Sequence, residues 1–253
     1  PDLQGIWTTD DMRGVPQQRP AEFGDRRYLT DEEFAQRFSR REGARQTQDR
    51  GAVGTFRNEE GTRTFGYTSM VIDPPDGRIP ALTPAAQAAA QQRQQAQAAR
   101  RRQLNGVEAD WTTDRSNYDR CISTGVLNSI TPKIYNSGSR IVQGPGWLAF
   151  QNEMIHETRV IPTDGRKKAG APIKSWMGNS VGRWEGDVLV VETRNIKPEA
   201  AVNGQPLSDE GVLIERFTLP DANTLDYRMT INDPKTYAAP FTVRLPIPRE
   251  ESY

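Results

Sequence analysis

The stretch WMGNSVGRWEGDVLVVETRNI, residues 176–196, carries the clearest structural signal in this chain. Residues 188–191 are apolar and rich in β-branched side chains, a run that is typical of a buried strand. Residues 185–187 read Glu-Gly-Asp, and the glycine can adopt the positive φ that a tight turn requires. The stretch therefore predicts a strand, a tight turn and a second strand.

Alternating apolar and polar residues extend this pattern over the C-terminal half. Residues 225–231 and 241–247 alternate in strand fashion, and residues 220–223, Pro-Asp-Ala-Asn, are typical of a hairpin turn. Strands at this spacing predict a mainly β fold built as an antiparallel meander, either a barrel or a strongly curved sheet. Residues 147–161 are expected to form strand too, with Leu148, Phe150, Met154, His156 and Val160 on one face and Gln151, Glu153, Glu157 and Arg159 on the other.

The N-terminal part is more polar and contains two predicted helices. Residues 30–33, Thr-Asp-Glu-Glu, form a capping-box pattern, and Phe34 and Phe38 would share one face of the helix that follows. Thr83 and Pro84 predict the start of a second helix, over residues 85–103, which contain only Ala, Gln and Arg. Because this helix lacks a large apolar stripe, we expect it to project into solvent. An RNA-binding arm is the alternative, and the interleaved aromatic residues that would favour it are absent.

Domain organisation follows from the distribution of large apolar residues. They are too sparse in residues 1–105 to build a separate core. We therefore expect a single domain over residues 1–253. In this domain, residues 106–253 form the β core, and residues 1–105 wrap around it with their two helices.

The composition excludes several classes of function. The 253 residues include 33 Lys plus Arg and 33 Asp plus Glu, so the chain lacks the basic surplus of a non-specific nucleic-acid binder. No apolar run reaches the about 18 residues that a transmembrane helix needs. One cysteine, Cys121, and one histidine, His156, rule out a disulfide within the chain and a Cys/His zinc cluster of the usual kind. Because nucleotide-binding glycine motifs and HExxH are also absent, we assign no metal and no cofactor.

His156 is the candidate catalytic residue, because an imidazole both accepts and donates protons near neutral pH. We expect it on a strand and facing a cavity, with Tyr118 and Asp114 as catalytic partners; a histidine packed in the core is the equal alternative. Glu157 and Arg159 would form an ion pair on the opposite face. The residues expected to bind substrate are Arg120, Tyr135, Phe150, Met154, Glu153 and Trp176.

Several segments together resemble a large family of secreted bacterial proteins without a settled activity. They are DLQGIW (2–7), Arg120-Cys121, IVQGPG (141–146), EMIHETR (153–159), residues 164–166, GRWEGDVLVVET (182–193), residues 215–217 and residues 233–234. The resemblance implies a lipocalin-like barrel, by analogy of fold. Members of this family usually continue past the equivalent of Tyr253 into a segment that contains a cysteine, which would be a natural partner for Cys121 in an oxidising compartment; a shortened member of the family is the alternative.

Three functions are compatible with these features. The first is a cofactor-free acid–base enzyme, a lyase, hydratase, isomerase or cyclase, that acts on a small, mostly apolar or aromatic molecule. The second is a non-catalytic periplasmic protein that binds such a molecule, and the third is an interaction module at a sheet edge. Because the chain starts at Pro1 without an initiator Met, we expect a secreted or periplasmic protein whose leader has been removed; a trimmed sequence is the alternative. A small-molecule ligand is the expected partner, and the sequence also allows a homo-oligomer.

Overall fold

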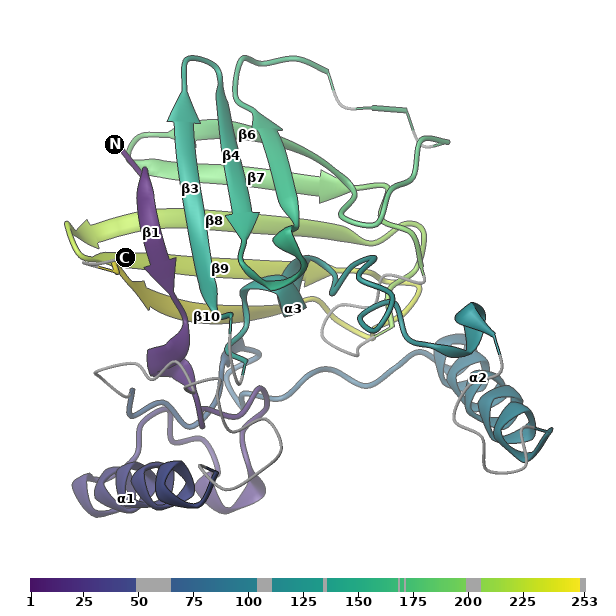
Figure 1. The fold of residues 1–253 in the computed structure, drawn as a ribbon, viewed down its shortest axis with the longest axis horizontal. Helices are drawn as coiled ribbons and strands as arrows, with labels where there is room; N and C mark the ends of the chain where they lie inside the picture. Colours follow the sequence, from purple (N-terminus) through teal and green to yellow (C-terminus); the bar gives the residue numbers. More distant parts are fainter. Residues whose placement is uncertain are drawn as a thin grey trace.

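Two antiparallel sheets face each other, with the strands of one crossing those of the other (Figure 1). The computed structural model describes residues 1–48, 65–103, 111–133, 136–167, 169–170, 172–198 and 206–250. The mainly β fold that the alternation predicts is confirmed. The four-stranded sheet, in spatial order, contains β1 (Gly5–Thr8), β3 (Gly138–Gly144), β4 (Trp147–Asn152) and β5 (Thr158–Pro162). The six-stranded sheet contains β2 (Val71–Asp73), β10 (Phe241–Pro248), β9 (Thr224–Asn232), β8 (Val212–Asp221), β7 (Val188–Arg194) and β6 (Asn179–Glu185).

The predicted strand, turn and strand of residues 176–196 form the β6–β7 hairpin. Glu185 pairs with Val188 at its end, and Gly186 between them has a φ of 60°. Only glycine adopts this left-handed backbone without steric cost, so the turn needs it at this position. The turn predicted at residues 220–223 is also confirmed, because Asp221 of β8 pairs with Thr224 of β9.

The core lies between the sheets, where the inward residues of both meet. Phe150 of β4 reaches across to Phe217 of β8, with 5.9 Å between the ring centroids. Phe217 in turn packs edge-on against Tyr227 of β9 at 5.1 Å. These three side chains are at most 1% exposed. Aromatic rings bury large apolar areas, so this cluster joins the two sheets into one body.

The described strands form two ladders rather than one closed barrel, yet the sheets meet at both edges. On one side Trp7 of β1 makes an isolated bridge with Arg249, just after β10. On the other side a Cβ at Gly182 of β6 would lie only 3.2 Å from Ile161 of β5 and 3.0 Å from Thr163. Glycine therefore permits the close approach of β6 to β5.

One predicted strand is interrupted, and the interruption reverses the faces of its second half. β4 ends at Asn152, and the short 3₁₀ turn η4 (Met154–His156) separates it from β5. Ile155 and His156 both have left-handed φ values, 60° and 57°. Because side chains alternate in a strand, the turn moves Arg159 to the buried side and leaves Val160 63% exposed. The expectation that Val160 shares the inward face of Phe150 is therefore wrong.

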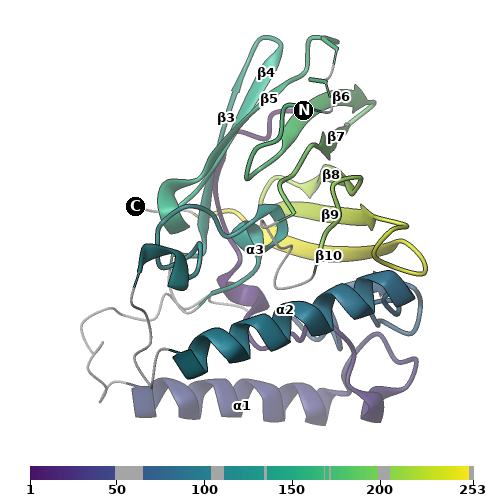
Figure 2. The same cartoon turned by 90° about the vertical axis from the view of Figure 1, so that its right-hand side faces the viewer.

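The two predicted helices are confirmed, and both lie outside the sheets (Figure 2). α1 (Asp31–Gln48) begins with the expected capping box, in which Glu33 N donates to Thr30 Oγ1 and Thr30 N donates to Glu33 Oε2. α2 (Pro84–Gln103) begins after Thr83, whose hydroxyl accepts from Ala86 N. The remaining helical segments are α3 (Val126–Ile130) and the 3₁₀ turns η1 (Asp10–Met12), η2 (Ala21–Phe23) and η3 (Thr112–Asp114).

The N-terminal segment contributes side chains to the core. Leu3, Trp7, Met12, Met70 and Val71 belong to the same cluster of buried side chains as the strand residues. Among the helices in the described part of the chain, none has both the length and the apolar character to cross a membrane.

Candidate functional site

A buried ion pair lies between the two sheets. Arg159 of β5 donates two hydrogen bonds of 2.7 Å to the carboxylate of Glu215 on β8. Their side chains are 5% and 0% exposed. Such a parallel double contact is the strongest geometry between arginine and a carboxylate. The pair therefore holds the four-stranded sheet to the six-stranded sheet by a directional contact, in addition to apolar packing.

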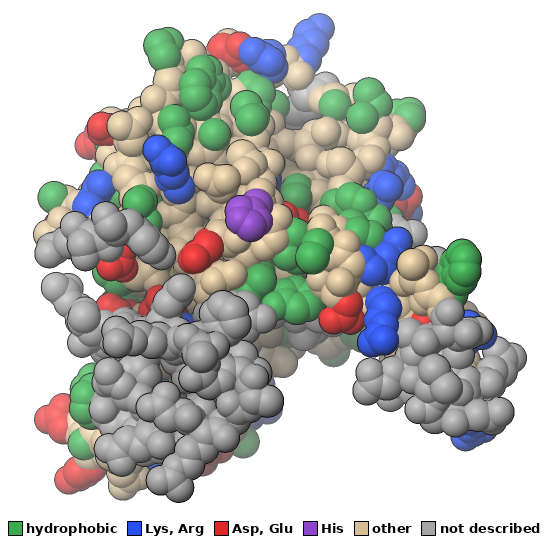
Figure 3. All heavy atoms as spheres, in the orientation of Figure 1, with side chains coloured by type: hydrophobic (Ala, Val, Ile, Leu, Met, Phe, Trp, Pro, Cys, Tyr) green, Lys and Arg blue, Asp and Glu red, His purple; other side chains and the backbone are tan. Residues whose placement is uncertain are grey.

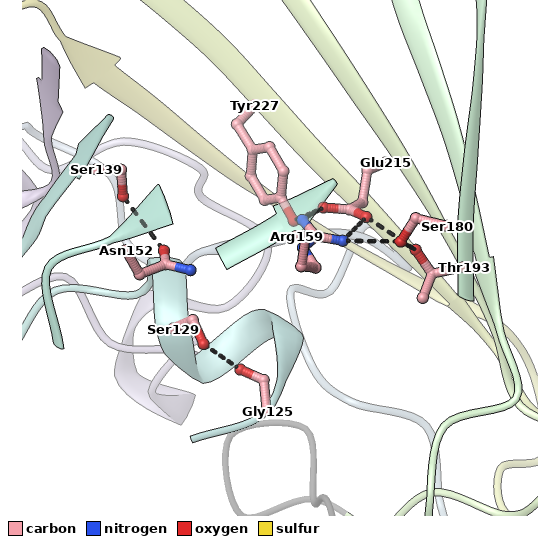
Figure 4. A network of polar contacts seen from close by, with 9 residues as sticks. All are labelled: Gly125, Ser129, Ser139, Asn152, Arg159, Ser180, Thr193, Glu215 and Tyr227. Carbon is pink, nitrogen blue, oxygen red and sulfur yellow. Dashed lines mark hydrogen bonds and ion pairs between the residues drawn. The ribbon is translucent and has the colours of Figure 1, made fainter. Parts of the chain in front are cut away.

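Three hydroxyl groups extend this pair into a network (Figure 4). Tyr227 donates to Glu215 Oε1 at 2.9 Å, and Thr193 donates to Glu215 Oε2 at 3.3 Å. Ser180 Oγ lies 2.8 Å from Thr193 Oγ1. Burial, together with the adjacent Glu215 carboxylate, raises the pKa of Tyr227 well above its usual value. Burial alone would lower the pKa of Arg159, but attraction to Glu215 outweighs it and raises that pKa.

A second buried carboxylate, Glu157, lies just after the η4 turn. Its Oε2 accepts hydrogen bonds from Thr124 N, Thr124 Oγ1 and Ser129 Oγ at 3.2, 2.9 and 2.7 Å. Within the described residues, its Oε1 and Arg159 Nε are buried without a hydrogen-bond partner. Lys133 donates to Ser129 O at 3.0 Å. Burial lowers the pKa of Lys133 to about 8, although attraction to Glu157 opposes this effect.

The prediction of an ion pair between Glu157 and Arg159 on the outward face is wrong. Both side chains are buried, and Arg159 pairs with Glu215 instead. The η4 turn is the physical reason, since it directs Glu157, which follows the turn, and Arg159 of β5 to the buried side. Sequence reasoning missed this network completely. A charged pair spaced two residues apart within a strand looks the same whether its face points inward or outward.

A groove lies at one end of the four-stranded sheet, on its outer face. Ile6, Arg140 and Gln151 are cross-strand neighbours on β1, β3 and β4 and form its floor. Glu153 and His156 form the wall that the η4 turn raises beside them. The groove has a volume of about 270 Å³. It combines an apolar side chain with an arginine, a carboxylate and an imidazole.

His156 lies in this groove and not in an enclosed cavity. It is exposed on the face that Figure 3 presents, where it is the purple side chain. The expectation that it lies on a strand and faces an interior is therefore wrong. Among the described residues, no side chain hydrogen-bonds to its imidazole. Its left-handed backbone, together with that of Ile155, stores strain, which is common where a protein positions a functional side chain.

Glu153 lies close to His156 along the groove wall. Its Oε2 accepts a hydrogen bond of 3.2 Å from Gly138 N at the start of β3. This contact anchors the carboxylate at the mouth of the groove. Of the residues expected to form the site, His156 and Glu153 are therefore brought together.

The other expected site residues lie elsewhere. Asp114 forms an ion pair of 2.8 Å with Arg100 of α2, and the Tyr118 hydroxyl lies 3.5 Å from Met154 Sδ. Phe150 belongs to the core, and Lys197 Nζ lies 4.8 Å from the Trp176 ring centroid. Arg120 and Cys121 are exposed, and Tyr135 lies outside the described residues. Asp114 is thus engaged by a helix outside the sheets, whereas Phe150 and Met154 serve as packing.

In the part of the chain that the structure describes, no group of three or more His, Cys, Asp or Glu side chains could hold a metal ion. Comparison with protein-family models, with curated proteins and with solved structures found no match for this chain. The chemistry that the groove can support therefore follows from its own geometry.

Proposed function

We propose that this protein binds a small molecule in the groove beside His156. The observation that carries the proposal is the set of side chains that line this groove, which has a volume of about 270 Å³. They include Ile6, Arg140, Glu153 and His156. An apolar surface with a few polar groups that converge on it is typical of small-molecule sites. The imidazole offers two ring nitrogens that no described side chain occupies. A small aromatic or mostly apolar molecule with one polar substituent suits this set.

Acid–base catalysis on the bound molecule is the second candidate function. It is favoured by the strained backbone at Ile155 and His156, which fixes the imidazole over the groove next to the Glu153 carboxylate. A proton could then move between His156 and a ligand without a redox cofactor. The reaction would be of the lyase, hydratase, isomerase or cyclase type. We favour binding, because an exposed groove excludes less water than an enclosed site.

One experiment separates the two functions. The protein is incubated in D₂O with a panel of small uncharged aromatic ketones and alcohols, and NMR records both binding and deuterium uptake at carbon. Binding to the wild type, weakened in His156→Ala and unchanged in Val160→Ala, supports the groove. Val160 is a suitable control because it is 63% exposed on β5 and lies outside the described lining of the groove. Protein-dependent deuterium uptake that His156→Gln abolishes supports catalysis. Equal binding by His156→Ala and the wild type would contradict binding through His156, and deuterium uptake that persists in His156→Gln would contradict catalysis.

We also propose that the two sheets are the walls of a flattened barrel of the lipocalin type. The Trp7–Arg249 bridge and the approach of β6 to β5 at Gly182 support this interpretation, because they join the sheets at both edges. If the two junctions are counted as strand neighbours, β3 to β10 follow one another in chain order, as in an antiparallel meander. β1 then lies between β3 and the end of β10. The interior is occupied by the Arg159–Glu215 network and the aromatic core, so the ligand site lies outside it.

A further inference from the structure

Four arginines and two tyrosines line a second groove, on the outer face of the six-stranded sheet. Its volume is about 140 Å³. Arg228 of β9 and Arg244 of β10 form one side, directly opposite each other in the strand register. Arg27, Tyr28 and Tyr67, from the N-terminal segment, form the other side. The groove lies on the opposite sheet from His156.

This groove carries a surplus of positive charge. Among the described residues, Asp226 is the carboxylate that its arginines contact, and it accepts from both Arg228 and Arg244. Arg27 is exposed and makes no ion pair within the described part of the chain. The fourth arginine, Arg19, is 4% exposed and donates hydrogen bonds to Thr68 Oγ1 and to the Pro75 carbonyl oxygen. Its positive charge therefore lies buried beneath the surface of the groove. One carboxylate cannot neutralise four guanidinium groups.

Without a bound anion, this positive charge lowers the stability of the folded protein. Like charges directly opposite each other destabilise a sheet, and the Arg228–Arg244 pair is of this kind. Asp226 bonds Arg244 through Nε, and Arg228 through Nε and Nη2. In the described part of the chain, both terminal nitrogens of Arg244 and Nη1 of Arg228 therefore keep donors for another acceptor. An oxyanion is the ligand that guanidinium donors bind best.

Aromatic rings border the same donors. The ring centroids of Tyr28 and Tyr67 lie 5.5 Å apart, and the Arg244 guanidinium carbon lies 5.9 Å from the centre of the Tyr67 ring. Tyr28 is 61% exposed, so its ring is accessible to a ligand in the groove. Its free face can stack on a planar group whose charged end reaches the arginines. From this geometry we propose that the groove binds a small aromatic molecule that carries an oxyanion.

Phenyl phosphate, inorganic phosphate and phenol are suitable probes, used with the full chain in titration calorimetry at low ionic strength. Phenyl phosphate should bind about tenfold more tightly than inorganic phosphate, the gain that ring stacking provides. Phenol, which lacks the charge, should not bind detectably. Absence of phenyl phosphate binding would overturn the proposal. Equal binding of both phosphates would overturn its aromatic part, and phenol binding as tightly as phenyl phosphate would overturn its anionic part.

Two variants locate the binding. Arg27→Gln should weaken phenyl phosphate binding about tenfold, because one charge-assisted hydrogen bond is lost. Arg27 has no ion pair in the described structure, so this variant leaves the fold intact. Arg183→Gln is the matched control, since Arg183 is exposed on β6 of the same sheet and bonds Glu185 outside the groove. Unchanged affinity in Arg27→Gln would overturn the proposal. His156→Ala should bind phenyl phosphate as the wild type does, which separates this groove from the proposed function.

Discussion

Arg159 and Glu215 show how burial changes the contribution of a charged side chain to the free energy of unfolding. An uncompensated buried charge is costly, so Glu215→Leu should lower the free energy of unfolding by about 3–5 kcal/mol. Urea denaturation measures the change. Glu185→Leu is the control, because Glu185 forms ion pairs with Arg183 and Arg216 on the exposed surface and its loss should not be measurable. The double variant Arg159→Met/Glu215→Leu should recover most of the loss. Equal effects of Glu215→Leu and Glu185→Leu would contradict this prediction.

Lys133 should make stability depend on alkaline pH. Burial lowers its pKa in the folded protein from 10.5 to about 8. Between these two values the unfolded chain binds more protons than the folded chain, so stability rises with pH. The cost of the buried charge is fully present below pH 8 and vanishes above pH 10.5. The wild type should therefore gain stability relative to Lys133→Met across this window. A difference between the two proteins that does not change with pH would contradict the prediction.

Among the elements, β1 should contribute more to stability than its short length suggests. Trp7 is fully buried, its indole N–H donates to Leu3 O at 3.1 Å, and its backbone forms the bridge to Arg249. Trp7→Ala should cost about 3–5 kcal/mol of unfolding free energy in chemical denaturation. Trp111→Ala is the matched control, because Trp111 is 69% exposed and its loss should change little. A small effect at Trp7 would show that β1 does not hold the two sheets together.

The elements also show what the sequence could predict. The β6–β7 hairpin and both long helices carry local signals, namely a glycine turn, a capping box and a proline at the first helical position. The η4 turn carries none, because an isoleucine rarely adopts a left-handed φ and nothing marks Ile155 as an exception. One unmarked turn therefore reversed the predicted faces of Glu157 and Arg159. For the same reason His156 was expected inside rather than in an exposed groove.

On the scale of the whole molecule, the alternation of polar and apolar residues in the C-terminal half predicts which side chains enter the core. Leu225, Tyr227, Met229 and Ile231 alternate into the core as expected. The pairing of strands across two sheets could not be predicted in the same way, because it depends on contacts between residues far apart in the chain. The Phe150–Phe217 contact and the Arg159–Glu215 pair are of this kind.

The contrast between buried apolar strands and polar helices predicts a wide range of local stability, which hydrogen exchange can measure. β9 lies between β8 and β10, and its inward side chains are fully buried, so its amides should exchange only through global unfolding. α2 buries no large apolar side chain, and its backbone hydrogen bonds can open without breaking the core. Its amides should exchange at least about a thousandfold faster than those of β9. Equal protection in α2 and β9 would mean that α2 is held by a contact that its composition does not predict.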